Sequence, residues 1–311
     1  MWYNINKTGR LGNRLFSRAH VYAAALEYGT TVIDWGINDL KHLFPYLANT
    51  KIPIYPLDIN NKIPNLPNNL LSRNFSLSTI HKLRPRNTGK FLNFWSQHYG
   101  KGDFEEMRLD SNNFRKFISS NNNIFLNGYK LTCTDWVRKY RTNICEYFKV
   151  PLSYSYKWTQ IIKVWKEKYS EIIGIHMRRS DFATAMRGDF YLSASEYADI
   201  LKKRTDIDFK KALILIFSED RFIKKTEWDQ LNDSFSFSNY ILNNGTVLDD
   251  LTGLMQSDRI IGPKTSTFSR WCAFAGNKEW AGIDRKSIQK NNLLEFMKCP
   301  IPFDHINNIK N

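Results

Sequence analysis

The chain has 311 residues, which at about 150 residues per domain is enough for one large domain or two ordinary ones. Hydrophobic residues make up 42% and charged residues 24%, a globular composition that excludes a disordered or collagen-like chain. With 45 Lys and Arg against 30 Asp and Glu, the net charge of +15 favours an anionic partner: nucleic acid, a lipid headgroup surface or a phosphorylated small substrate.

Four cysteines, at positions 133, 145, 272 and 299, have neither CxxC spacing nor a matching pair of histidines. This pattern argues against a zinc site and against a dense disulfide framework, so reduced thiols are expected. The N-terminus lacks a long apolar stretch, and no window reaches the 18 or more apolar residues of a membrane span. We therefore expect a cytoplasmic protein, whose basic surface could still rest against an anionic membrane.

The first clear element is a glycine-rich loop that opens an amphipathic helix. After Gly9-Arg10-Leu11-Gly12-Asn13, apolar residues recur at helical spacing until Gly29. Residues 30–35 (TTVIDW) then predict a strand, and residues 123–129 (NIFLNGY) predict another. Loop, helix and strand in this order are typical of an α/β domain.

A helix predicted over residues 136–148 ends before Pro151, and we place the domain boundary just beyond it. The predicted domains are residues 1–153 and 154–311. In the second domain, apolar segments alternate with helical ones, and a Ser193 or Ser195 cap opens the first helix. The predicted strands are 171–176, 212–218 and 259–262, and the predicted helices are 195–203, 247–255 and 267–275. Strands followed by polar loops and helices predict a parallel sheet, whose ligands bind at the carboxyl ends of the strands.

Chemistry-bearing residues follow three of these predicted strands. Residues 176–181 (HMRRSD) pair two arginines, whose planar guanidinium groups bind a diphosphate bidentately. Ser218-Glu219-Asp220 offers a carboxylate to a ribose or a base, or else caps a helix. Residues 263–271 (PKTSTFSRW) crowd hydroxyls at a helix N-terminus, where they serve as caps or as part of an anion site.

Four segments resemble, in the same order, motifs of the α-1,2-fucosyltransferases of glycosyltransferase family 11. Residues 9–16 (GRLGNRLF) resemble the opening GGLGNQ(L/M)F, and residues 176–181 resemble the HxRRxD peptide shared with core α-1,6-fucosyltransferases. Residues 218–220 resemble the FSDD segment, and residues 266–273 (STFSRWCA) resemble NSTFSWWGA. The four segments span nearly the whole chain.

This chain also departs from the family motifs. Arg14 replaces the usual glutamine, Ser17 and Arg18 interrupt an alanine-rich stretch, and Arg270 replaces one tryptophan of the WW pair. These departures bear on the acceptor and the exact sugar more than on the fold.

The resemblance implies the GT-B fold, in which two Rossmann-like domains face each other across a cleft. The N-terminal domain would serve the acceptor, and the C-terminal domain would hold the nucleotide sugar. The implied reaction is an inverting transfer of L-fucose from GDP-β-L-fucose to a glycan hydroxyl, giving an α-linkage. No metal and no other cofactor would be needed.

Departure of GDP requires positive charge on the β-phosphate, which Arg178 would supply with help from Arg179. Asp181 is the first candidate for the base or for orienting the arginines, and the base is otherwise unassigned. The residues expected to hold the donor are His176, Arg178, Asp220, Ser266, Thr267, Ser269, Gly9, Gly12 and Asn13.

One pattern points to a different chemistry. Asp206-Ile207-Asp208 fits the DxD pattern by which another transferase fold holds manganese. The flanking Arg204, Lys210 and Lys211 favour a solvated turn instead.

Two alternatives to fucosyl transfer stay open. A GT-B transferase for another nucleotide sugar is one, because the arginines recognise the diphosphate and not the sugar. A nucleic-acid-binding protein is the other, and it explains the charge but not the polar residues at three successive strand ends.

Overall fold

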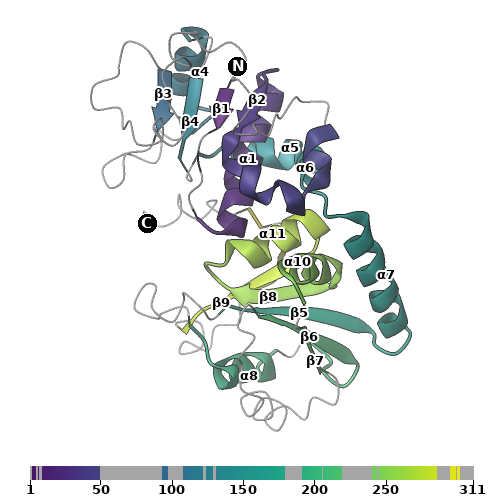
Figure 1. Cartoon of the computed structure of the whole chain (residues 1–311). Coiled ribbons are helices and arrows are strands. Elements are labelled where there is room, and N and C mark those ends of the chain that lie inside the picture. The colour runs from purple at the N-terminus through teal and green to yellow at the C-terminus, as the bar shows by residue number, and fades with distance from the viewer. Residues whose placement is uncertain are drawn as a thin grey trace. The chain divides into compact units, whose positions relative to one another are not determined.

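A computed structural model gives the structure of the chain (Figure 1). It describes residues 2–4, 6, 9–49, 93–96, 108–121, 124–128, 131–178, 191–204, 206–218, 240–243, 245–285, 295–298 and 300–301. The chain forms two compact units, which divide between Lys149 and Val150. The boundary expected after residue 153 therefore falls in the first turn of helix α7 (Leu152–Lys166), which belongs to the second unit.

The first unit contains a four-stranded parallel sheet in the order β2-β1-β4-β3. Tyr3 of β1 lies opposite Ile33 of β2 and Phe125 of β4. The strands are β1 (Trp2–Asn4), β2 (Val32–Asp34), β3 (Asn93–Ser96) and β4 (Ile124–Asn127). The helices are α1 (Leu11–Glu27), η1 (Trp35–Leu43), η2 (Pro45–Asn49), α4 (Asn112–Ser119), α5 (Thr134–Lys139) and α6 (Arg141–Tyr147). The single helix predicted over 136–148 is thus two helices, which meet at Tyr140.

The predicted helix is present as α1, but it begins at Leu11, inside the segment 9–13 that was predicted as a loop. It is anchored by a fully buried ion pair. Arg18 Nε lies 2.9 Å from Asp34 Oδ2 at the end of β2, and Arg18 Nη2 donates to the carbonyl oxygen of Asn6 at 3.1 Å. The hydroxyl of Tyr22 donates to Asp34 at 2.7 Å. Because an unpaired buried charge is costly, these contacts give the polar departure at Arg18 a structural role.

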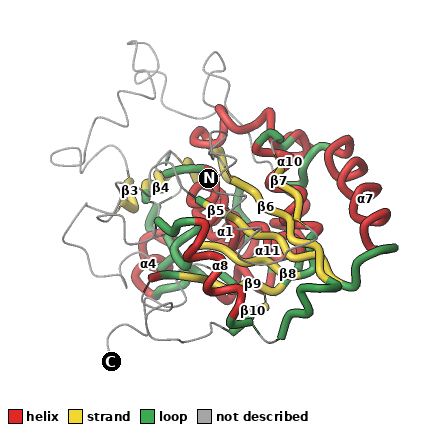
Figure 2. The backbone as a smooth tube through the Cα atoms, turned by 90° about the horizontal axis from the view of Figure 1, so that it is seen from below, coloured by secondary structure: helices red, strands yellow, loops and turns green. Residues whose placement is uncertain are grey.

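The second unit contains a six-stranded sheet in the order β10-β9-β8-β5-β6-β7. Figure 2 shows its central strands side by side. All neighbours are parallel except β9 and β10. The strands are β5 (Glu171–Met177), β6 (Ala212–Ser218), β7 (Tyr240–Asn243), β8 (Arg259–Pro263), β9 (Glu279–Ile283) and β10 (Met297–Lys298). The sequence predicted β5, β6 and β8, and all three are present.

Helices cover both faces of this second sheet. Tyr197, Ala198 and Leu201 of α8 (Ala194–Lys202) pack into one core with the odd-numbered β5 residues Ile173 and Ile175. Helices α10 (Val247–Gln256) and α11 (Thr267–Gly276) lie on the other face (Figure 1). Because side chains alternate along a strand, the even-numbered β5 residues face these two helices. The alternation directs His176 toward the α11 face.

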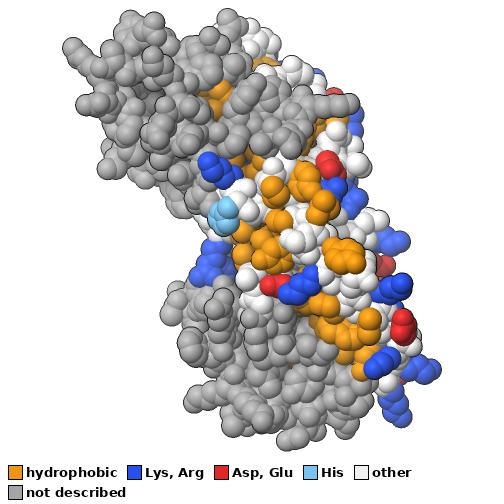
Figure 3. Space-filling model, turned by 45° about the vertical axis from the view of Figure 1, so that its right-hand side comes forward, with side chains coloured by type: hydrophobic (Ala, Val, Ile, Leu, Met, Phe, Trp, Pro, Cys, Tyr) orange, Lys and Arg blue, Asp and Glu red, His pale blue; other side chains and the backbone are white. Residues whose placement is uncertain are grey.

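Helix α7 has a buried face and an exposed face. Trp158 and Ile162 are buried, whereas Leu152, Tyr156 and Val164 are 62%, 69% and 54% exposed. In Figure 3, hydrophobic side chains of the described residues gather in patches, with lysines and arginines beside them. In the described part of the chain, no helix combines the length and the apolar character needed to cross a bilayer.

Candidate functional site

The candidate site lies where the strand connections of the second sheet change direction. From β5 the chain proceeds to β6 and β7 on one side, and β8 and β9 then extend the sheet on the other side. In such a sheet, ligands bind outside the carboxyl ends of the two central strands, here β5 and β8. Ile175 of β5 lies opposite Ile261 of β8, so the segments that follow both strands emerge at the same edge. Residues 176–178, the described part of the predicted 176–181 segment, lie there beside the predicted 263–271 segment, and His176 bonds Ser266.

His176 lies at the centre of this edge and is 6% exposed. Its Nδ1 is hydrogen-bonded to Ser266 Oγ at 3.1 Å, and its ring centre lies 5.2 Å from that of Phe268. From the opposite face, the hydroxyl of Tyr197 donates to the His176 carbonyl oxygen at 3.1 Å. Burial, and secondarily the positive charge of Arg178, lower the pKa of His176 from 6.5 to about 3. The imidazole is therefore neutral at physiological pH and acts as a buried link between β5 and α11.

The N-terminus of α11 is built by two inward-facing serines. Ser266 is the N-cap, and its Oγ accepts a hydrogen bond from the Ser269 amide at 3.4 Å. Ser269 Oγ in turn accepts from Trp280 Nε1 at 3.1 Å. Both side chains are fully buried, so these two hydroxyls hold the helix in place. Thr267, the third hydroxyl residue expected to hold the donor, is partly exposed. Capping, the alternative that the sequence left open, applies to Ser266.

The first turn of α11 contains no acidic residue. The positive end of the helix dipole and the first backbone N–H groups are therefore not offset by a carboxylate on the helix itself. Arg178 follows β5 at the same edge, close enough to His176 for its charge to lower the imidazole pKa. An arginine beside a helix N-terminus can bind a phosphate group.

The remaining predicted residues are placed differently. Arg179, Asp181 and Asp220 lie outside the described residues. Gly9, Gly12 and Asn13 lie in the first unit, at the start of α1. Gly9 has a φ of +88°, and a Cβ there would lie 2.8 Å from Asn13 Cβ. Glycine is thus required at this position by both the backbone and the close packing.

No protein-family profile and no curated protein sequence matches the chain. Solved structures do match it. An arginine-to-lysine mutant of Arabidopsis thaliana FUT1 in complex with GDP has a TM-score of 0.62 and 13% identity, covering 96% of this chain and 74% of that one. The fucosyltransferase NodZ from Bradyrhizobium has a TM-score of 0.57 and 15% identity, covering 96% and 99%. POFUT1 in complex with GDP-fucose has a TM-score of 0.51 and 11% identity, covering 89% and 93%.

This chain has the GT-B fold of those fucosyltransferases. At these identities the likeness shows the fold alone, and it confirms the α/β GT-B architecture that the motifs predicted. The candidate site thus lies at the carboxyl edge of the sheet in the second unit of a GT-B chain.

Trp280 is a site residue that the sequence did not reveal. It lies on β9, a five-residue strand that was not predicted, and it is 1% exposed. Its indole N–H donates to Ser269 Oγ, and the guanidinium carbon of Arg270 lies 4.5 Å from the centre of its ring. A Cβ at Gly282 would lie 2.4 Å from the Trp280 ring. A lone tryptophan in a short apolar segment carries no sequence signal for this role.

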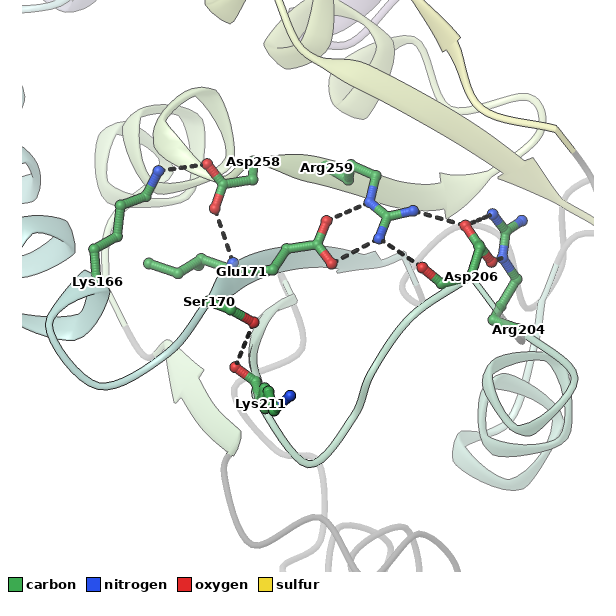
Figure 4. Close-up of polar contacts among 9 residues, drawn as sticks. Lys166, Ser170, Glu171, Arg204, Asp206, Lys211, Asp258 and Arg259 are labelled. Atoms are coloured by element: carbon green, nitrogen blue, oxygen red, sulfur yellow. Dashed lines mark hydrogen bonds and ion pairs between the residues drawn. The ribbon is translucent and has the colours of Figure 1, made fainter.

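The DxD pattern lies near the opposite, amino edge of the same sheet. Asp206 accepts hydrogen bonds from Arg204 at 2.7 and 2.8 Å and from Arg259 at 2.6 Å (Figure 4). Arg259 and Glu171, also bonded to each other, are the first residues of β8 and β5. The hydrogen bonds from Arg204 are the main cause of the lowered pKa of Asp206.

Asp206 lies in an exposed turn, as the sequence predicted, and it also belongs to a charge network that ties the starts of two strands together. Asp208 pairs with Lys211 at 3.4 Å. Within the described ranges, no group of three or more His, Cys, Asp and Glu side chains is arranged to hold a metal ion.

Proposed function

We propose that this chain is a glycosyltransferase that moves L-fucose from GDP-β-L-fucose to a hydroxyl of a glycan acceptor. One observation carries the proposal: Arg178, at the end of β5, and the N-terminus of α11, bonded to His176, lie at the same carboxyl edge of a GT-B sheet, at its switch point. Solved structures with this fold include a FUT1 complex with GDP and a POFUT1 complex with GDP-fucose. A nucleoside diphosphate is an anion of the size and charge that such an edge binds.

In the proposed reaction, the acceptor oxygen attacks the anomeric carbon of fucose from the face opposite GDP. The new carbon–oxygen bond forms as the bond to the β-phosphate oxygen breaks, and the electron pair leaves with GDP. Attack from the opposite face inverts the β-configuration of the donor to an α-linkage. The acceptor proton passes to a base, for which Asp181 is the first candidate.

The main contribution of the chain would be charge stabilisation. Negative charge grows on the β-phosphate as GDP departs, and the Arg178 guanidinium can form two parallel hydrogen bonds to it. Arg179 would assist, and the backbone N–H groups at the start of α11 would add donors that need no reorganisation. Because these groups already balance the diphosphate charge, the proposed transfer needs no metal ion.

The sugar and the linkage are the finer parts of the proposal. Fucose is supported by the four motif resemblances and by the GDP-fucose that POFUT1 binds. The α-1,2 linkage is supported by the family 11 resemblance. An arginine clamp also suits other GDP-sugars, so the test must compare sugars as well as bases.

The test is nucleotide binding followed by a donor panel. The melting temperature is measured with GDP, UDP and CMP, since a ligand that binds only the native state stabilises it by mass action, by about 2.7 kcal/mol at 100 times Kd. We expect GDP alone to raise the melting temperature, and GDP-fucose to be turned over faster than GDP-mannose or UDP-galactose. Equal stabilisation by all three nucleotides, or none by any, would overturn the proposal.

A further inference from the structure

Arg270 is a buried arginine on α11 with two specific contacts. It is 8% exposed, and its guanidinium carbon lies 4.5 Å from the centre of the Trp280 ring. Its Nη2 donates to the carbonyl oxygen of Lys264 at 2.8 Å. A guanidinium can do both at once, because its flat face stacks on the ring while its edge donates hydrogen bonds.

The Lys264 carbonyl belongs to the turn that leads from β8 into α11. The amide of Lys264 donates to the carbonyl oxygen of Ile283 on β9 at 2.8 Å, and the amide of Ser266 donates to that of Pro263 at 2.8 Å. With Arg270 on its carbonyl oxygen, Lys264 is held on both sides of its backbone. The turn Lys264–Ser266 is thereby fixed immediately before the first N–H groups of α11.

Trp280 completes this arrangement. Its indole N–H donates to Ser269 Oγ in the first turn of α11, and the Arg270 guanidinium stacks on its ring. Gly282 leaves room for both the Trp280 ring and the turn, because a Cβ at this position would lie 2.4 Å from the ring and 3.0 Å from Lys264 Cα. Strand β9, the helix and the turn are therefore coupled through a single side-chain stack.

We propose that Arg270 is a positioning residue of the donor site, which holds the turn Lys264–Ser266 so that the N-terminus of α11 presents its N–H groups to the diphosphate. The inference rests on the proposed function, since it assumes that a nucleotide binds at this edge. Arg270 stands where the resembling motif has a tryptophan, so the hydrogen bond to Lys264 is a feature of this chain.

The test compares two ring-stacked arginines on the same sheet. Arg259 is the matched control, because its guanidinium carbon lies 4.7 Å from the Phe296 ring centre but at the amino edge. GDP affinity is measured by calorimetry at 25 °C for the unmodified chain and for Arg270→Met, Arg270→Lys and Arg259→Met. Methionine keeps much of the apolar stem and cannot donate a hydrogen bond, whereas lysine keeps the charge and can donate one.

We expect Arg270→Met to weaken GDP binding about tenfold, the equivalent of one lost charge-assisted hydrogen bond. Arg270→Lys should recover part of that loss. Arg259→Met should lower the melting temperature, since it leaves Glu171 and Asp206 without a shared partner, and should leave GDP affinity unchanged. In steady state, Arg270→Met should raise the KM for GDP-fucose and also lower kcat, because the N–H groups of α11 would bind the diphosphate in the ground state and stabilise the charge that grows on it in the transition state.

The outcomes separate the two proposals. If the unmodified chain does not bind GDP, the proposed function and this inference fall together. If the unmodified chain binds GDP, and Arg270→Met and Arg270→Lys bind GDP as tightly as it does, only the positioning role is overturned. Equal loss of affinity in Arg259→Met would mean that general destabilisation is responsible, which also overturns the positioning role.

Discussion

Substitution of Ser266 by alanine tests the buried hydrogen bond at the centre of the candidate site. Ser266 caps α11 and also bonds His176, whose imidazole is buried. Loss of an N-cap costs about 1 kcal/mol, and a buried polar group left without its partner costs about 1–3 kcal/mol. Ser266→Ala should therefore lower the free energy of unfolding by about 2–4 kcal/mol.

Ser193→Ala is the matched control. Ser193 caps α8 by accepting from the Glu196 amide at 3.2 Å, and the Glu196 side chain returns a bond to Ser193 in a capping box. The other contact of the Ser193 hydroxyl is to the exposed Ser195. This substitution removes a cap but leaves no buried polar group without a partner. It should therefore lower the free energy of unfolding by about 1 kcal/mol.

The assay is urea unfolding at pH 7, monitored by tryptophan fluorescence, with both variants compared at unchanged m-value. A difference of about 1–3 kcal/mol between the two alanine variants is the contribution that the reasoning assigns to the Ser266–His176 bond. Equal losses in the two variants would refute it, because the bond to His176 would then add nothing beyond capping.

Three further predictions follow from the described contacts. Arg178→Lys, which keeps the charge but loses the bidentate geometry, should reduce kcat about 100-fold with the fold intact by circular dichroism; near-normal turnover would place the phosphate clamp elsewhere. Transfer should persist in excess EDTA, and Asp206→Asn with Asp208→Asn should change activity little; manganese rescue of an EDTA-silenced enzyme would contradict this. Because the pKa of His176 is lowered to about 3, the unfolded chain binds the extra proton between pH 6.5 and 3, and stability should fall by up to about 1.4 kcal/mol per pH unit as the pH drops. Urea midpoints at pH 7 and pH 5 should therefore differ less in His176→Gln, although His20, with a pKa lowered to about 4, adds a slope of the same sign.

The long apolar segments of the second half could be predicted from sequence. Strands β5 and β6 are seven-residue strands that are buried almost throughout, and such strands stand out as continuous hydrophobic stretches. Ser193 was one of the two predicted caps, and the structure selects it because Glu196 completes the capping box. Strands β1 (WYN) and β9 (EWAGI) were missed, although β2 (VID) and β8 (RIIGP) have the same lengths and were predicted, because β1 and β9 lack the adjacent β-branched residues of β2 and β8.

The sequence identified the site segments but not the direction of their side chains. The hydroxyls at the start of α11 were candidates for anion binding, and two of them instead bond His176 and Trp280 inside the fold. Residue type predicts which groups can hydrogen-bond. Which partner they choose depends on a strand more than ten residues away in sequence, and no local pattern encodes that choice.

The net charge of +15 is distributed unevenly between the two edges of the second sheet. At the amino edge of the second sheet, Glu171 and Asp206 are bonded to arginines, so positive and negative charges offset each other there. At the carboxyl edge, the described hydrogen bonds of His176, Ser266 and Ser269 join neutral groups, and the low pKa of His176 keeps that network uncharged. An ion pair between Lys264 and Asp284 at 3.5 Å also lies at this edge, and the first turn of α11 contains no acid. For the proposed diphosphate donor, this distribution of charge between the two edges, more than the net charge, would favour binding at the end of β5.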